Sequence, residues 1–120
     1  MAVNLVSQRE IVEVPYQLPD GIIKPHMALV LSTEKLQLAE DGMFYAALIS
    51  SKNLNPEFTI QIKNEWLNKP LSKKSYFVTH IVSYYRTEEV IQSYNNFVKS
   101  EYFDQIINKV ILSMFDIEIE

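Results

Sequence analysis

Two histidines are the side chains in this chain best suited to acid–base chemistry near neutral pH. They are His26 and His80, and the chain has no others. An imidazole can take up a proton in one protonation state and release it in the other, so two of them can act as base and acid. RNA cleavage by the RNA's own 2′-hydroxyl needs such a pair and a cation facing the phosphate. His26 and His80 are therefore candidate catalytic residues, and the alternative is two hydrogen-bonded structural histidines.

Hydroxyl and cationic side chains near the histidines and at the ends of apolar segments could complete such a site. Ser50 and Ser51 follow the apolar stretch Met43 to Ile49, and their hydroxyls could bind a phosphate oxygen or cap a loop. We take both serines as candidate catalytic residues. The RNA-binding candidates are Lys24, Lys52, Thr79 and Arg86. For the three basic residues among them, the alternative is an ordinary surface charge exposed to solvent.

Several kinds of active site are excluded by what the chain lacks. It contains no cysteine, which removes a thiol nucleophile, a disulfide framework and a cysteine-ligated zinc. It has no glycine-rich phosphate loop, no HExxH and no GxSxG. Two histidines are too few for a histidine metal site, and no carboxylate spacing points to one. We therefore expect no metal site and no cofactor.

The acidic charge of the chain is concentrated in its last third. The formal net charge is −4. Residues 1–86 carry nine Lys or Arg and eight Asp or Glu, whereas residues 87–120 carry two Lys and seven Asp or Glu. A protein that coats nucleic acid would be basic overall, so that class is disfavoured. A local site for a polyanion on the first part of the chain remains open, and the acidic tail could itself occupy a groove.

The length of 120 residues is close to the usual size of one domain, so we expect a single domain over residues 1–120. No apolar run approaches the ~20 residues that a membrane-spanning helix needs. The N-terminus lacks the charged and apolar regions of a signal peptide. The expectation is a cytoplasmic protein with no membrane contact.

The periodicity of apolar residues changes along the chain and predicts a β-rich first part followed by helices. Runs rich in β-branched and aromatic residues predict five short strands, and Thr87 followed by two glutamates resembles a helix start. This pattern favours a β-rich α+β fold, a small, partly open barrel followed by C-terminal helices. The expected strands are 10–16, 27–31, 43–49, 58–62 and 76–85, and the expected helices are 34–40, 88–98 and 101–114.

Four segments, in order, resemble motifs of the MazF/PemK family of toxin–antitoxin ribonucleases. Glu10 to Tyr16 resembles the opening GDIVxVxF strand, and Lys24 to Ser32 resembles the xRPALVLS segment. Ile49-Ser50-Ser51 is similar to the family's ITS. Leu71 with Ser75 to Ser83 is similar to L…SYVRxHKIxT. The resemblance covers residue 9 to about residue 97.

This resemblance implies an SH3-like barrel that forms a homodimer, cuts single-stranded RNA without a metal and is inhibited by an antitoxin protein. The family's arginines align with His26 and Val78, so this chain lacks them, while a hydroxyl is retained at Ser50 or Ser51. An arginine supplies a permanent charge and a bidentate fork that histidine does not replace. Two functions therefore stay open: a toxin-like endoribonuclease, and a catalytically inactive relative that serves as a binding or regulatory module.

Overall fold

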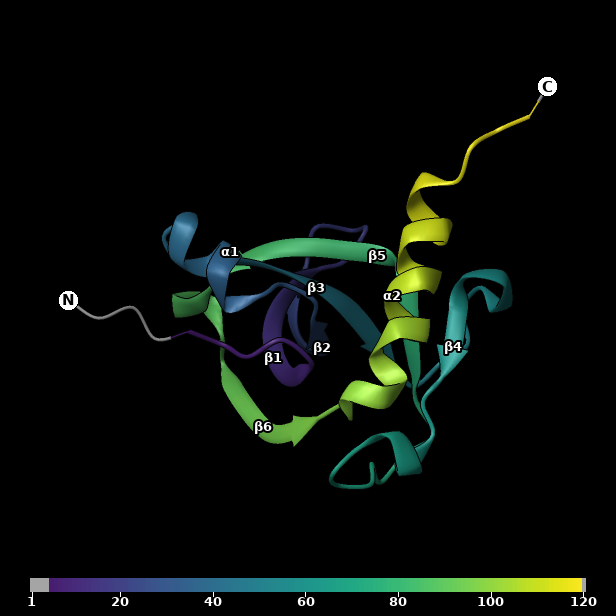
Figure 1. The fold of residues 1–120 in the computed structure, drawn as a ribbon, viewed down its shortest axis with the longest axis horizontal. Coiled ribbons are helices and arrows are strands. Elements are labelled where there is room, and N and C mark those ends of the chain that lie inside the picture. Colours follow the sequence, from purple (N-terminus) through teal and green to yellow (C-terminus); the bar gives the residue numbers. More distant parts are fainter. Residues whose placement is uncertain (1–4, 120) are drawn as a thin grey trace.

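Six antiparallel strands form one curled sheet, and two helices pack on it (Figure 1). The computed structural model describes residues 5–119 of the chain. The strand order is β4-β5-β3-β2-β1-β6. The strands are β1 (Glu10–Gln17), β2 (Ile23–Val30), β3 (Met43–Ser50), β4 (Thr59–Gln61), β5 (Tyr76–Arg86) and β6 (Gln92–Phe97), and the helices are α1 (Glu34–Ala39) and α2 (Ser100–Phe115). This architecture confirms the expected β-rich α+β fold. Within residues 5–119, no helix is long and apolar enough to span a membrane.

Most of the expected elements are present at nearly the expected positions. All five expected strands form, although β2 begins four residues early and β4 is shorter than expected because a 3-10 turn, η1 (Pro56–Phe58), precedes it. Helix α1 begins after Thr33, whose hydroxyl accepts a hydrogen bond of 3.2 Å from the Leu36 amide. The C-terminal helix expected at 101–114 is α2.

The helix expected at 88–98 is wrong, because this segment forms β6. The helix-start signal at Thr87 is realised only as one 3-10 turn, η3 (Thr87–Glu89), in which Glu89 accepts a hydrogen bond from the Arg86 amide. The segment then pairs with β1. Without this pairing, the backbone groups on the outer edge of β1 would be unpaired. Asn95 adopts a positive φ of 49°, which no helix interior tolerates. The apolar side chains at helical spacing therefore misled the prediction.

Strand β5 bends sharply in its middle, and the bend lets the sheet close (Figure 1). Ala47 of β3 pairs with Val82, but Leu48 pairs with Val78, so three residues of β5 bulge out between them. The buried Thr79 lies in this bulge. Its hydroxyl lies 2.6 Å from the Phe58 carbonyl oxygen, to which it donates, and 2.8 Å from the Ser113 hydroxyl of α2. The bulge thereby links β5, η1 and α2.

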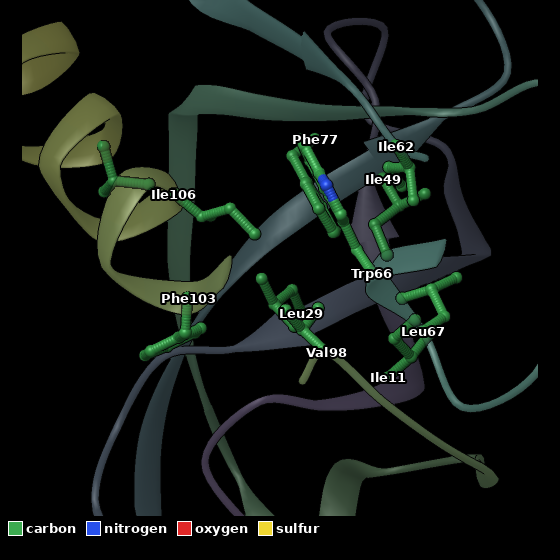
Figure 2. Close-up of a cluster of buried hydrophobic side chains, with 11 residues drawn as sticks. Ile11, Leu29, Ile49, Ile62, Trp66, Leu67, Phe77, Val98, Phe103 and Ile106 are labelled. Carbon is green, nitrogen blue, oxygen red and sulfur yellow. The ribbon is translucent and has the colours of Figure 1, made fainter. Parts of the chain in front are cut away.

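Two apolar clusters lie on opposite faces of β1 and β2, which explains the continuous apolar run of β2. Leu29 belongs to the larger cluster, which includes Phe77, Trp66 and Ile106 (Figure 2). Its neighbours Ala28 and Val30 belong to the smaller cluster, because side chains alternate along a strand. Residues 28–30 are therefore buried on both faces of the sheet.

The buried face of α2 should account for much of the stability of the fold. Ile106 is fully buried against the sheet, whereas Ile111 on the same helix is 49 % exposed. We expect Ile106→Ala to lower the free energy of unfolding by about 2–5 kcal/mol, because it leaves a cavity. Ile111→Ala should change it by less than about 0.5 kcal/mol. Urea unfolding followed by tryptophan fluorescence measures both. Equal losses would contradict this placement of α2.

Candidate functional site

A cleft of about 550 Å³ opens where the first turn, the loop after β3 and the loop before β5 meet over the sheet. Its walls combine apolar side chains, hydroxyls, two lysines, one carboxylate and one imidazole. The lining residues are Glu13, Leu18, Pro25, His26, Met27, Ile49, Ser50, Ser51, Lys52, Leu54, Leu71, Ser72, Lys73, Ser75 and Tyr94.

The cleft brings together four of the eight candidate residues, namely His26, Ser50, Ser51 and Lys52. Ala28 of β2 pairs with Leu48 of β3. Because side chains alternate along a strand, His26 and Ser50, each two residues further toward the cleft, belong to the same strand face. The half-buried His26 packs edge-on against Tyr16, with ring centroids 5.2 Å apart. Its Nδ1 lies 3.2 Å from the Lys24 carbonyl oxygen.

The serine hydroxyls occupy the rim where β3 ends. Ser50 accepts a hydrogen bond of 3.1 Å from the Lys52 amide. It therefore caps the loop, which is one of the two roles expected for it. Its hydroxyl proton remains available for a phosphate oxygen, since accepting one bond leaves the donor unused. Ser51 and Lys52 are both exposed. The rim is therefore polar and open to solvent.

His80 does not line the cleft. It lies in the bulge of β5 and packs against Phe58, with ring centroids 5.1 Å apart. Its Nδ1 is buried and has no hydrogen-bond partner among residues 5–119. The two candidate histidines therefore do not line one cleft, because His80 lies in the bulge of β5 and packs against Phe58 of η1 instead.

The other candidate residues are also set apart from the cleft walls. The Thr79 hydroxyl is buried and engaged with Phe58 and Ser113, so it cannot contact RNA. Arg86 pairs with the first residue of β3, the opposite end from Ser50, and its guanidinium donates to the Asp41 carbonyl oxygen at 3.2 Å. Lys24 is exposed beside the cleft, two residues before His26.

Glu13 and Tyr94 are functional candidates that the sequence analysis missed. The Tyr94 hydroxyl donates to Glu13 Oε2 at 2.7 Å, and both side chains line the cleft. Burial, followed by the hydrogen bond to Glu13 and the negative charge of that carboxylate, raises the pKa of Tyr94 to about 12. Tyr94 therefore stays a hydroxyl donor at neutral pH. A carboxylate inside an apolar strand was the available signal, but the helix expected at 88–98 hid its partner.

Lys73 is the second cation of the cleft, and it comes from the loop before β5. It lines the same cleft as Lys52, which comes from the loop after β3. Among residues 5–119, no three histidine or carboxylate side chains converge as they do in a metal site.

Comparison with known proteins identifies the fold. No family model and no curated protein matches the sequence. Solved structures match at TM-scores near 0.7. One is a MazF of Deinococcus radiodurans, with a TM-score of 0.69 and 12 % identity over 92 % of this chain and 96 % of that one. Another is the Mycobacterium tuberculosis toxin MazF-mt6, at 0.68 and 11 % over 92 % and 100 %.

A third match is a mycobacterial endoribonuclease in complex with its cognate antitoxin, with a TM-score of 0.68 and 8 % identity over 90 % of this chain and 93 % of that one. The chain has the MazF fold. This confirms the fold that the four sequence motifs implied, and it does so over nearly the whole chain, including α2. Such low identities carry the fold alone.

The Glu13–Tyr94 contact gives a measurable signature. In a spectrophotometric titration, the difference between wild type and Tyr94→Phe isolates the ionisation of one tyrosine. We expect this difference to appear near pH 12, rather than near the pH of about 10 at which an ordinary tyrosine ionises, because Glu13 and burial oppose a second negative charge. A difference centred near pH 10 would show that the two side chains do not meet.

Proposed function

We propose that this chain is a toxin-like endoribonuclease that cleaves single-stranded RNA in the cleft without a metal. One observation carries the proposal: the cleft gathers a carboxylate, an imidazole, several hydroxyls and two lysines on a scaffold with the MazF fold. Two matching structures are named as endoribonucleases or MazF toxins, and one holds a cognate antitoxin. RNA cleavage by the 2′-hydroxyl needs a base, an acid and cations, which these residues can supply.

In this mechanism, Glu13 and His26 move the protons from opposite faces of the β1–β2 pair, since Glu13 is paired with Met27 and His26 with Val14. The Glu13 carboxylate accepts the proton of the 2′-hydroxyl as the 2′-oxygen forms a bond to phosphorus. The bond from phosphorus to the 5′-oxygen breaks, and protonated His26 donates a proton to that oxygen. The products are a 2′,3′-cyclic phosphate and a free 5′-hydroxyl. Tyr94 is a positioning residue, because its hydroxyl holds Glu13 Oε2.

The lysines and serines bind the phosphate in the same scheme. Lys52 and Lys73 supply positive charge from two loops, and Ser50 and Ser51 supply hydroxyl donors between them. Charge placed where the phosphorane forms lowers the barrier more than the same charge in water, because the cleft excludes part of the solvent. Lys24 extends the basic surface along β2.

The proposal includes two protein partners. An antitoxin protein would inhibit the enzyme by covering the cleft. One structure with the same fold is an endoribonuclease in complex with its cognate antitoxin. A homodimer is the second partner we propose. Tyr45 and Tyr84 pair edge-on across β3 and β5 with ring centroids 6.3 Å apart, and they are 41 % and 67 % exposed. This aromatic pair is a surface that a second copy could cover.

A specific observation favours the second candidate function, an inactive binding or regulatory module. The chain has only two arginines. The side chain of Arg9 donates to the Val98 carbonyl oxygen at 2.7 Å, and that of Arg86 donates to Asp41. Neither lines the cleft. A cleft without guanidinium can bind RNA through lysines and still fail to stabilise the phosphorane.

Substitutions of the two histidines distinguish the endoribonuclease from the inactive binding module. We expect His26→Ala to lower the rate of cleavage of a labelled single-stranded RNA by about 10²–10⁴-fold, the usual contribution of a positioned proton donor. Glu13→Gln should act similarly. His80→Ala is the matched control and should leave the rate unchanged, provided that its thermal melting matches wild type. Purified wild type that binds RNA but cuts none between about pH 5 and pH 9, which brackets imidazole titration, would favour the binding module.

The lysines make a second, independent prediction. If Lys52 and Lys73 each contact one phosphate, the double change Lys52→Ala with Lys73→Ala should reduce the slope of log affinity against log salt by about 1.4, because each single-strand contact contributes about 0.7. The control, Lys35→Ala with Lys99→Ala, removes two exposed lysines outside the cleft. Fluorescence anisotropy with labelled RNA measures both slopes. Equal slopes for the two pairs would place the RNA elsewhere.

A further inference from the structure

A run of exposed apolar side chains lies at the C-terminal end of the described chain. Phe115 is 72 % exposed, Ile117 is 83 % exposed and Ile119 is 94 % exposed. They continue an exposed apolar surface on the last turns of α2, made by Ile111, Leu112 and Met114. Figure 1 shows the segment after α2 extending away from the rest of the fold. Fully exposed isoleucines in an extended segment gain stability only when something covers them.

The same segment carries acidic residues in strict alternation with the apolar ones. We use "C-terminal segment" for residues 115–120, Phe-Asp-Ile-Glu-Ile-Glu. Asp116 has extended backbone angles, with φ −68° and ψ 153°. When bound as a β-strand, the segment places successive side chains on opposite sides. Ile117 and Ile119 then share one side, and Asp116 and Glu118 share the other.

The cleft offers the complementary surface. Its walls include apolar residues such as Met27, Ile49 and Leu71, and Leu54 at its edge is 62 % exposed. Lys52 and Lys73 provide two positive charges, against the single carboxylate of Glu13. An extended segment with one apolar and one acidic side fits such a site, because its isoleucines can cover the apolar walls while its carboxylates meet the lysines.

The groove beside the C-terminal segment is a different one from the cleft that the segment fits. The segment leaves α2 along a shallow groove lined by Glu57, Phe58 and Lys109, and this groove shares no lining residue with the cleft. Lys109 fixes that end of α2 by donating to the Glu57 carbonyl oxygen at 2.6 Å. We propose that the C-terminal segment of one copy of this chain binds in the cleft of another copy. The segment then regulates the chain by competing with RNA for the cleft, and this regulatory role rests on the proposed function.

Disulfide trapping tests the contact directly, because the chain has no cysteine. One full-length variant carries Leu54→Cys at the cleft, and a second carries Ile119→Cys in the segment. Both positions are exposed, so neither change disturbs the core. After mixing and mild oxidation, we expect the Leu54→Cys/Ile119→Cys heterodimer to exceed by about tenfold the heterodimer formed with a control acceptor, Leu38→Cys. Leu38 is 67 % exposed on α1, outside the cleft.

Charge changes identify what drives the contact. Adding Lys52→Glu and Lys73→Glu to the Leu54→Cys chain should lower the heterodimer yield by about tenfold, since two favourable pairs become repulsive. Asp116→Asn with Glu118→Gln in the Ile119→Cys chain should lower it as well. The matched control is Glu101→Gln with Asp104→Asn, which removes two exposed charges from α2 and should leave the yield unchanged. Equal trapping at Leu54 and Leu38, or none at either, would overturn the proposal.

An RNA measurement separates this proposal from the proposed function. Trapping reports the contact with no RNA present, so a chain that cuts no RNA can still form the cross-link. If both proposals hold, Ile117→Ser, which leaves position 119 free for the trapping cysteine, should strengthen RNA binding at high protein concentration and low salt, where copies inhibit one another. RNA binding that is unchanged in a variant whose trapping is abolished would overturn the competition.

Discussion

The hydroxyl of Thr79 is the contact on which the rest of the structure depends. β5 has to pair with β3 along both halves and with β4 along its first half, and it can do so only by bending. The bend leaves three residues without partners on β3. Thr79 compensates by bonding to Phe58 and Ser113, which belong to two other elements. A buried hydroxyl with two such partners stabilises the bend and also fixes where α2 lies.

The cleft is a consequence of this closure. Once β5 has turned, its first half carries Phe77 into the larger apolar cluster with Leu29 and Trp66 (Figure 2). The loop before β5 and the loop after β3 then line one cleft, to which the first contributes Lys73 and the second Lys52. At the other side of the sheet, β6 pairs with β1 and places Tyr94 on Glu13. The site is therefore assembled from both edges of one sheet rather than from a single motif.

The elements that local chemistry determines could be predicted from the sequence. The continuous apolar run before Ser32 and the capping hydroxyl of Thr33 each specify a local conformation, and the strand and the helix expected on either side of them are both present. The motifs around His26 and Ser50 gave the fold, because their order along the chain reflects the order of the strands. Half of the eight candidate residues named from the sequence line the cleft, and they come from β2 and from the end of β3.

The remaining errors arise where distant segments decide the local structure. Residues 90–98 have a helical apolar pattern, but the free edge of β1 and the positive φ of Asn95 make them a strand. No local pattern reveals a three-residue bulge in a strand as uniform as β5, so alternation alone could not show that His80 turns away. Glu13 could be recognised as a site residue only with Tyr94 beside it, and that contact joins residues 81 positions apart.

The presence of lysines and a histidine, and of no arginine, among the described residues that line the cleft determines what can bind there. A guanidinium binds phosphate through two directed hydrogen bonds, whereas an ammonium acts as a compact point charge. Lys52 and Lys73 therefore attract a carboxylate almost as well as a phosphate, and they discriminate little between the two by geometry. Discrimination must come from the apolar walls, which bases can contact by stacking and isoleucines can cover by burial. A cleft of this chemistry is open to acidic, apolar peptides as well as to RNA, and its occupancy depends on their relative concentrations and on salt.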